Sequence, residues 1–219
     1  KNVASKLDSL ERRTSSSVIR VLHIGDSHIQ AEFVTNALRA MLQDTYGNAG
    51  RGLVSPLRLA GTNQPVDYTI TAPDVTNWRK TRLLKLPWEA TPGVTGIAAQ
   101  PIKATTTTIK VLGAGHRITL ATILTANGDR TYTYTTPQDS IIINLEANES
   151  LYGAILENGQ PGVLYSAIGN NGACFTDYLL IPGFVKSTKI FHPDLIILSL
   201  GTNEGFSYMT DDEIQRCTT

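Results

Sequence analysis

Residues 18–28 read VIRVLHIGDSH, and this stretch decides the fold. Its first part, residues 18–24, is mostly apolar and rich in β-branched side chains, which is typical of a strand buried on both faces. The run ends at Gly25-Asp26-Ser27. Apolar side chains then recur at spacings of three and four over residues 29–42, and Gly47 follows as a helix stop signal. The stretch therefore predicts a strand, a tight turn and a helix.

Two more strand-like runs further along the chain end in turns of the same kind. Residues 163–168 lead into Gly169-Asn170-Asn171-Gly172, and residues 194–200 lead into Gly201-Thr202-Asn203-Glu204. Strands that alternate with helices pair in parallel, and ligand-binding groups gather at the carboxyl ends of such strands. We therefore expect all three glycine-containing turns at one edge of a single parallel sheet.

The segment between the first and second units has a different composition. It is rich in Thr, Ile, Tyr, Val and Gly, and it shows almost no helical periodicity. Turn signals separate its strand-like runs at residues 105–112, 117–124, 130–135, 140–145 and 151–156. The sequence therefore predicts an α/β core made of residues 1–61 and 163–219, which an all-β sandwich over residues 62–162 interrupts.

The composition excludes several classes of protein. Hydrophobic residues at 41% argue against disorder, and no apolar run approaches the roughly 20 residues that cross a bilayer. Nineteen basic residues balance nineteen acidic ones, which disfavours binding to nucleic acid. Cys174 and Cys217 are too few for a disulfide scaffold and wrongly spaced for a zinc cluster. We expect no transmembrane segment, no metal and no cofactor.

The three predicted turns carry groups that acyl transfer requires. A serine between a strand and a helix, as Ser27 is, presents its hydroxyl at an exposed tip. The N–H of Gly172 and the carboxamide of Asn203 can stabilise a developing oxyanion. Each residue alone is also an ordinary turn former or helix cap, and a purely structural interpretation stays open. It leaves unexplained, however, why all three turns meet at one sheet edge.

These blocks resemble those of the SGNH, or GDSL-like, hydrolases, which are serine esterases with a flavodoxin-like three-layer α/β/α fold. Gly25-Asp26-Ser27-His28 is similar to the first block, with His28 where Leu is commonest. Gly172 falls where the second block has its glycine, and Leu200-Gly201-Thr202-Asn203-Glu204 is similar to the third, with Glu204 in place of Asp.

The resemblance implies a role for each matching residue. Ser27 would be the nucleophile. Its own N–H, the N–H of Gly172 and the side chain of Asn203 would form the oxyanion hole. Asp26 and His28 would have supporting roles, and we expect Asp26 to organise the turn by hydrogen bonding.

With its β insertion, the chain is most similar to bacterial peptidoglycan O-acetylesterases, in which the inserted module resembles a carbohydrate-binding domain. This implies removal of O-acetyl groups from a cell-wall or other polysaccharide, in the periplasm, at the cell surface or outside the cell. Arg51 is a candidate for contact with an anionic substrate group. The candidates for stacking on sugar rings are Trp78, Trp88, Tyr132 and Tyr134. In the alternative interpretation, the chain is a non-catalytic glycan-binding module that uses the β insertion.

The family's fourth block, Asp-x-x-His, which carries the general base, has no counterpart in the chain. None of the four histidines, His23, His28, His116 and His192, is expected to replace it. The sequence also predicts three parallel strands, whereas a flavodoxin-like sheet has about five. We therefore expect the chain to be an amino-terminal part, inactive alone, whose remaining C-terminal part supplies the base from a missing or separate chain.

Overall fold

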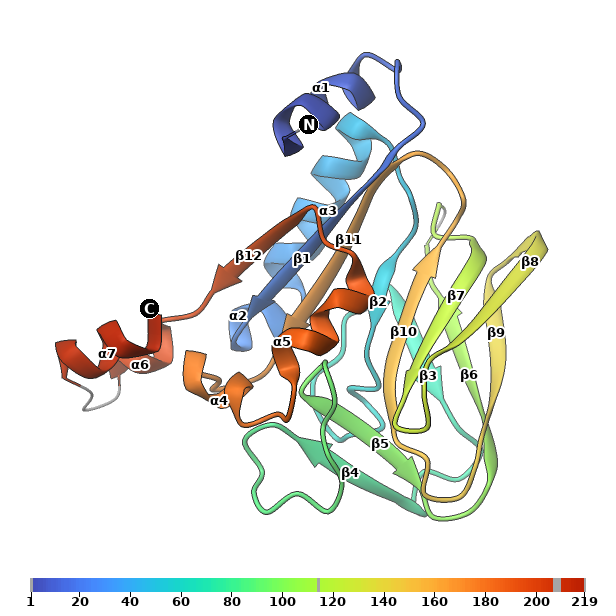
Figure 1. The fold of residues 1–219 in the computed structure, drawn as a ribbon. Helices are drawn as coiled ribbons and strands as arrows, with labels where there is room; N and C mark the ends of the chain where they lie inside the picture. The colour runs from blue at the N-terminus through green and yellow to red at the C-terminus, as the bar shows by residue number, and fades with distance from the viewer. Residues whose placement is uncertain (1, 114, 207–209, 219) are drawn as a thin grey trace.

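The computed structural model describes residues 2–113, 115–206 and 210–218, and it contains one parallel and two antiparallel sheets (Figure 1). The chain is therefore a mixed α/β protein, as predicted. The described helices are α1 (Val3–Glu11), α2 (Ser27–Gln30), α3 (Phe33–Tyr46), α4 (Phe175–Leu179), α5 (Phe184–Ser187), the 3₁₀ helix η1 (Thr188–Phe191), α6 (Thr202–Phe206) and α7 (Asp211–Thr218).

The parallel sheet has the strand order β11-β1-β12. β1 (Val18–Gly25) lies in the centre, and β11 (Gly162–Gly169) and β12 (Leu195–Ser199) both run parallel to it. Gly25 lies opposite both Gly169 and Ser199, so the three strands end at the same level. The turns that follow them therefore share one edge of the sheet.

Helices pack on both faces of this sheet. On one face, Val21 of β1 packs in a cluster with Leu7 of α1 and Leu42 of α3. On the other face, Leu22 of β1 packs in a cluster with side chains of the segment 175–191, which contains α4, α5 and η1. β1 is thus buried on both sides, which explains its continuous apolar sequence. The finer assignment to a flavodoxin-like sheet stays a prediction.

The two antiparallel sheets share one apolar core. The larger has the order β4-β5-β10-β7-β8, with β2 also paired to β10, and the smaller has the order β3-β6-β9. Ile123 of the larger sheet and Ile109 and Ile143 of the smaller belong to one buried cluster. The strands are β2 (Gly52–Val54), β3 (Tyr68–Thr71), β4 (Trp78–Arg82), β5 (Ile97–Pro101), β6 (Thr105–Val111), β7 (Ile118–Thr125), β8 (Arg130–Gln138), β9 (Ser140–Leu145) and β10 (Leu151–Glu157).

Five of these strands, β6 to β10, coincide closely with the predicted runs, whereas β2 to β5 were not predicted. β2 lies within the range assigned to the α/β core, yet it pairs with β10. The antiparallel sheets thus include residues 52–54, which precede the predicted boundary at residue 62. The division of the chain into two domains at residues 62 and 162 stays a prediction.

β12 forms an edge of the parallel sheet and carries exposed apolar side chains. Within the described ranges it pairs with β1 alone. Ile196 and Leu198 are 50% and 57% exposed, and they line an apolar groove together with Phe184 and Val185. Within the described ranges, this edge of the parallel sheet is therefore apolar and open to solvent. Over the described parts of the chain, no helix is both long and apolar enough to cross a membrane.

Candidate active site

The first turn holds Ser27 at an exposed position. Asp26 is 1% exposed, and its Oδ1 accepts a hydrogen bond from the His28 backbone N–H at 2.9 Å, which caps the start of α2. The same oxygen lies 2.8 Å from Nδ1 of the His28 ring. Asp26 therefore organises the turn, as expected, and Ser27 sits at the N-terminus of α2 with its side chain open to solvent.

The second turn presents a free backbone donor. Asn170 N–H donates to the carbonyl of Gly25 at 3.3 Å, which ties this turn to the end of β1. Gly172 adopts φ +82°, a left-handed conformation that glycine tolerates best. Among the described residues, nothing accepts a hydrogen bond from the Gly172 N–H, and the residue is exposed.

The third turn links the other two through Asn203. Nδ2 of its carboxamide donates to the carbonyl oxygen of Ala173 at 2.9 Å and to Oδ2 of Asp26 at 3.4 Å. Ala173 follows Gly172, and Asp26 precedes Ser27, so the carboxamide lies between the two turns. The bond to Asp26 is at the long end of hydrogen-bond distances and is therefore weak. The structure brings the turns of all three predicted site residues together.

Glu204 fixes the third turn to α4. Its side chain is 1% exposed, and Oε1 accepts a hydrogen bond from the Phe175 N–H at 2.6 Å, at the start of that helix. A carboxylate at a helix N-terminus is favourable because the N–H groups there carry partial positive charge. Glu204 therefore holds the third turn against the start of α4 in this structure.

Two side chains that the sequence did not indicate form hydrogen bonds that hold the first and second turns in place. The hydroxyl of Tyr178 donates to the Gly25 carbonyl at 2.6 Å and accepts from Asn170 Nδ2 at 3.1 Å. Burial raises the pKa of Tyr178, so its phenol stays a donor. Gln30 Oε1 accepts from the Asn171 N–H at 2.8 Å, and its Nε2 donates to Thr62 at 2.7 Å. Neither residue belongs to a recognisable motif.

No histidine in the described ranges is hydrogen-bonded to the Ser27 hydroxyl. The His28 ring is 64% exposed and contacts Asp26. The ring of His23 lies between the Tyr165 hydroxyl and the Ser199 hydroxyl, each at 2.6 Å, and burial lowers its pKa. The expectation that none of the four histidines is the base stays a prediction, and this geometry agrees with it.

Arg51 is not a surface residue, and its assignment to substrate binding was wrong. Its side chain is fully buried, and it forms ion pairs with Glu32 at 3.0 Å and with Asp67 at 2.8 Å. Arg39 pairs with the same two carboxylates. These four residues are called the buried ion cluster below. The partners are distant in sequence, so the glycine-rich context of Arg51 gave no sign of its burial.

The aromatic candidates also differ from expectation. Trp78 is 7% exposed and belongs to the core between the antiparallel sheets, so its ring is not available to stack on a sugar. Tyr132 and Tyr134 pack against the same core and are partly buried. Trp88 is half-buried, and its Nε1 donates to the carbonyl of Leu83 at 2.9 Å. Trp88 and the two tyrosines stay predictions for sugar contact.

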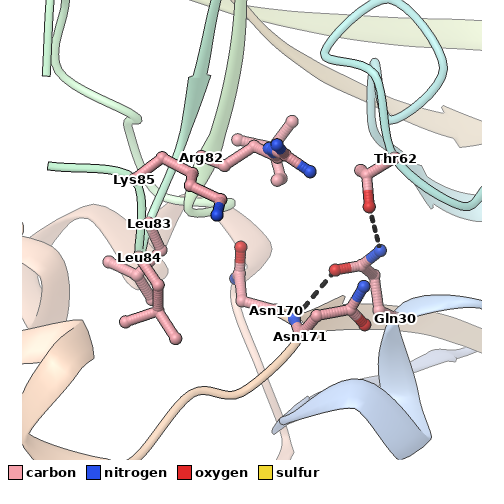
Figure 2. Close-up of a pocket in the computed structure, with 9 residues that line it drawn as sticks. Gln30, Thr62, Arg82, Leu83, Leu84, Lys85, Asn170 and Asn171 are labelled. Atoms are coloured by element: carbon pink, nitrogen blue, oxygen red, sulfur yellow. Dashed lines mark hydrogen bonds between the residues drawn. The ribbon is translucent and has the colours of Figure 1, made fainter.

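A cavity of about 300 Å³ adjoins the first two turns (Figure 2). Its lining comes from α2, the second turn, the end of β4 with the loop that follows it, the start of β5, and the segment between β2 and β3. The lining residues are Gln30, Thr62, Arg82, Leu83, Leu84, Lys85, Ile97, Asn170 and Asn171. Arg82 and Lys85 were not singled out by the sequence analysis. Within the described ranges, no group of three or more His, Cys, Asp or Glu side chains is placed to hold a metal ion.

Comparison with known proteins finds a likeness of fold and no likeness of sequence. No protein-family model matches the chain, and no curated protein matches it in sequence. The chain superposes on a solved structure described as "Peptidoglycan O-acetylesterase in action, 5 min", with a TM-score of 0.76 and 23% sequence identity. The alignment covers 97% of this chain and 67% of that one. The chain has an acetylesterase-like fold. At this identity the likeness concerns the fold alone.

Proposed function

We propose that the chain carries the nucleophile and the oxyanion hole of an SGNH-type serine esterase, which removes O-acetyl groups from a cell-wall or other polysaccharide outside the cytoplasm. The observation that carries the proposal is the Asn203 carboxamide, whose hydrogen bonds reach Asp26 and Ala173 and so join the turns of Ser27 and Gly172. The likeness of the fold to a peptidoglycan O-acetylesterase supports the same assignment.

In the proposed reaction, Ser27 Oγ attacks the acetyl carbonyl carbon while a general base takes its proton. The carbonyl oxygen becomes an oxyanion that accepts hydrogen bonds from the N–H of Ser27, the N–H of Gly172 and Nδ2 of Asn203. The intermediate then collapses, and the sugar oxygen leaves with the proton from the base. Water hydrolyses the acetyl-serine in a second, equivalent cycle, releasing acetate.

The Asn203 donor is available to the oxyanion at small cost. Its hydrogen bond to Asp26 is 3.4 Å long, so turning this N–H toward the oxyanion breaks only a weak interaction. The shorter bond to Ala173 keeps the carboxamide in place during this change. One such donor is typically worth about 3 kcal/mol of transition-state stabilisation.

The general base is proposed to lie outside this chain, on a C-terminal Asp-x-x-His segment of the same protein or on a separate chain. Two features support this. None of the described histidines is hydrogen-bonded to Ser27 Oγ, and the exposed apolar side chains of β12 offer a surface on which further sheet structure could pack. His28, whose ring Asp26 orients, is proposed to have a supporting role beside the nucleophile.

The test is acetate release from acetylated glycans by the complete gene product. The wild-type protein should release acetate, and Ser27→Ala should abolish the release. Ser140→Ala, which removes an exposed hydroxyl at the start of β9, is the matched control and should keep full activity. If the glycan binds to wild-type protein but no acetate appears, the non-catalytic glycan-binding alternative replaces this proposal.

A further inference from the structure

The charged side chains that line the cavity beside the turns are all positive. Arg82 and Lys85 line it, and no acidic side chain does. Within the described ranges, neither cation has a carboxylate at ion-pair distance, and the recorded bond of Arg82 is a long one, 3.5 Å, to the carbonyl of Gly61. The formal charge of the whole chain is zero, so the positive charge here is a local feature.

The remaining polar lining suits a sugar. Gln30, Asn170 and Asn171 contribute amide side chains, and Thr62 contributes a hydroxyl. Such neutral groups, placed at a few points in a concave site, fix the orientation of a polar ligand. In Figure 2, Gln30 connects Asn171 to Thr62 through two hydrogen bonds, so this wall of the cavity is held in place before any ligand enters.

Two residues that line the cavity are close in sequence to the groups of the proposed oxyanion hole. Gln30 lies in α2, three residues after Ser27, and Asn171 immediately precedes Gly172. A Cβ added to Gly172 would lie 3.1 Å from Cδ1 of Leu84, in the loop that also carries Lys85. The segment that carries the two cations therefore lies close to the second turn, on the side where the inference below places a neighbouring sugar.

The two cations favour one class of ligand. A neutral glycan would leave both positive charges in the cavity without a counter-charge. A carboxylate can accept two parallel hydrogen bonds from the planar guanidinium of Arg82, and the ammonium of Lys85 adds a second attraction. Concave sites lined by one sign of charge also concentrate the field, which raises the local concentration of oppositely charged ligands.

We propose that this cavity binds a carboxylate-bearing sugar next to the acetylated one, so that the substrate class is an acidic glycan. The inference rests on the proposed function, because it takes the neighbouring turns as the place where the ester is cleaved. Arg82 and Lys85 are then substrate-binding residues that select the polymer by its charge, and they take no part in the bond changes.

The test measures binding, so that it stays separate from hydrolysis. An acetylated oligogalacturonide and its methyl-esterified, neutral counterpart are titrated by calorimetry into protein that carries Ser27→Ala, which keeps the acetyl groups intact. The acidic form should bind about tenfold tighter or more, which corresponds to about 1.4 kcal/mol, because its carboxylate accepts charge-assisted hydrogen bonds that the ester cannot accept. Adding Arg82→Gln and Lys85→Gln should remove this preference and leave binding of the neutral form unchanged.

The matched control is Lys103→Gln with Lys110→Gln, which removes the same charge from two exposed positions, one between β5 and β6 and one in β6. This control should keep the preference for the acidic form. The inference is overturned if the Ser27→Ala protein binds the acidic and neutral forms equally. It is also overturned if the control loses the preference as fully as the Arg82→Gln, Lys85→Gln variant does. Failure of the proposed function appears elsewhere, as acetate release that survives Ser27→Ala, so the two failures can be told apart.

Discussion

The three turns and the buried ion cluster are both built from polar residues that lie far apart in sequence. They differ in whether those polar groups find hydrogen-bond or ion-pair partners within the protein. In the buried ion cluster, Arg39 and Arg51 are 1% and 0% exposed, and both pair with Glu32 and Asp67. At the turns, the Ser27 hydroxyl and the Gly172 N–H are exposed and have no partner within the described ranges. Polar groups that converge mark a reactive site only where some of them stay free.

Charge compensation explains why the cluster tolerates burial. Burial lowers the pKa of Arg51, but the carboxylates of Glu32 and Asp67 outweigh this, and its pKa lies above the usual range. Burial likewise raises the pKa of Asp67, whereas Arg51 and Arg39 lower it by more. The cluster also connects α3 to the segments that carry β2 and β3, so it has a structural role.

The largest expected effect is the loss of activity on replacing Ser27, whose hydroxyl has no hydrogen-bond partner within the described residues. Ser27→Ala should reduce acetate release by the complete gene product at least about 10³-fold, because it removes the nucleophile. Its free energy of unfolding should change by less than about 0.5 kcal/mol, since the hydroxyl is exposed and makes no hydrogen bond within the described residues. Denaturant titration and acetate assays of the same preparation check both values.

The opposite pattern is expected for the buried ion cluster. Arg51→Met leaves two buried carboxylates with less compensation and should destabilise the fold by about 3–5 kcal/mol. Arg58→Met, at an exposed position, should cost little. Urea unfolding of both variants tests this. If Arg51→Met is as stable as Arg58→Met, the cluster does not have the structural role assigned to it.

Asn203→Ala should affect both activity and stability, each to an intermediate extent. It removes one oxyanion donor and should lower kcat by about 10²–10³-fold. It also removes the bond between the second and third turns, so a loss of stability of about 1 kcal/mol is expected. Asn127→Ala, in the exposed turn between β7 and β8, is the control for both readouts. A normal kcat in Asn203→Ala contradicts its role as a donor.

The smallest effect concerns acid stability. The pKa of Asp67 is lowered in the folded state, so its stabilising contribution is complete above its ordinary pKa of about 4 and is lost as the pH falls through the folded value. Asp67→Asn should therefore flatten the dependence of unfolding free energy on pH below about pH 4. Asp44→Asn, at an exposed position on α3, should leave that dependence as steep as in the wild type.

The sequence predicted the parallel sheet well because β1 and β11 are buried on both faces, and their sequences are accordingly mostly apolar without strict alternation. Parallel topology then placed the three turns at one edge. β4 was missed because its residues, WRKTR, are mostly polar and lack strand alternation. The pairing of Arg51 with Glu32 could not be predicted, because it depends on how α3 and β2 pack in the folded chain.

Only part of the candidate site could be predicted from the sequence, because the rest depends on how distant segments pack together. Ser27, Gly172 and Asn203 stand out because each follows an apolar run that forms a strand of the parallel sheet. Tyr178 and Gln30, which hold the turns in place, lie in short helices without a motif. Arg82 ends β4 and Lys85 lies in the loop that follows it, so the position of both depends on the antiparallel sheets. Such supporting and lining residues follow from tertiary packing, which a single sequence does not display.

The most direct measurement of the central claim is the mapping of a covalent label. The complete gene product, shown to release acetate, is treated with a fluorophosphonate, which reacts with activated serines, and the modified residue is located by peptide mass spectrometry. The account predicts that the label lies on Ser27 and that Asn203→Ala is labelled more slowly. Label on a different serine, or an acetate-releasing preparation in which Ser27 stays unlabelled, would contradict it.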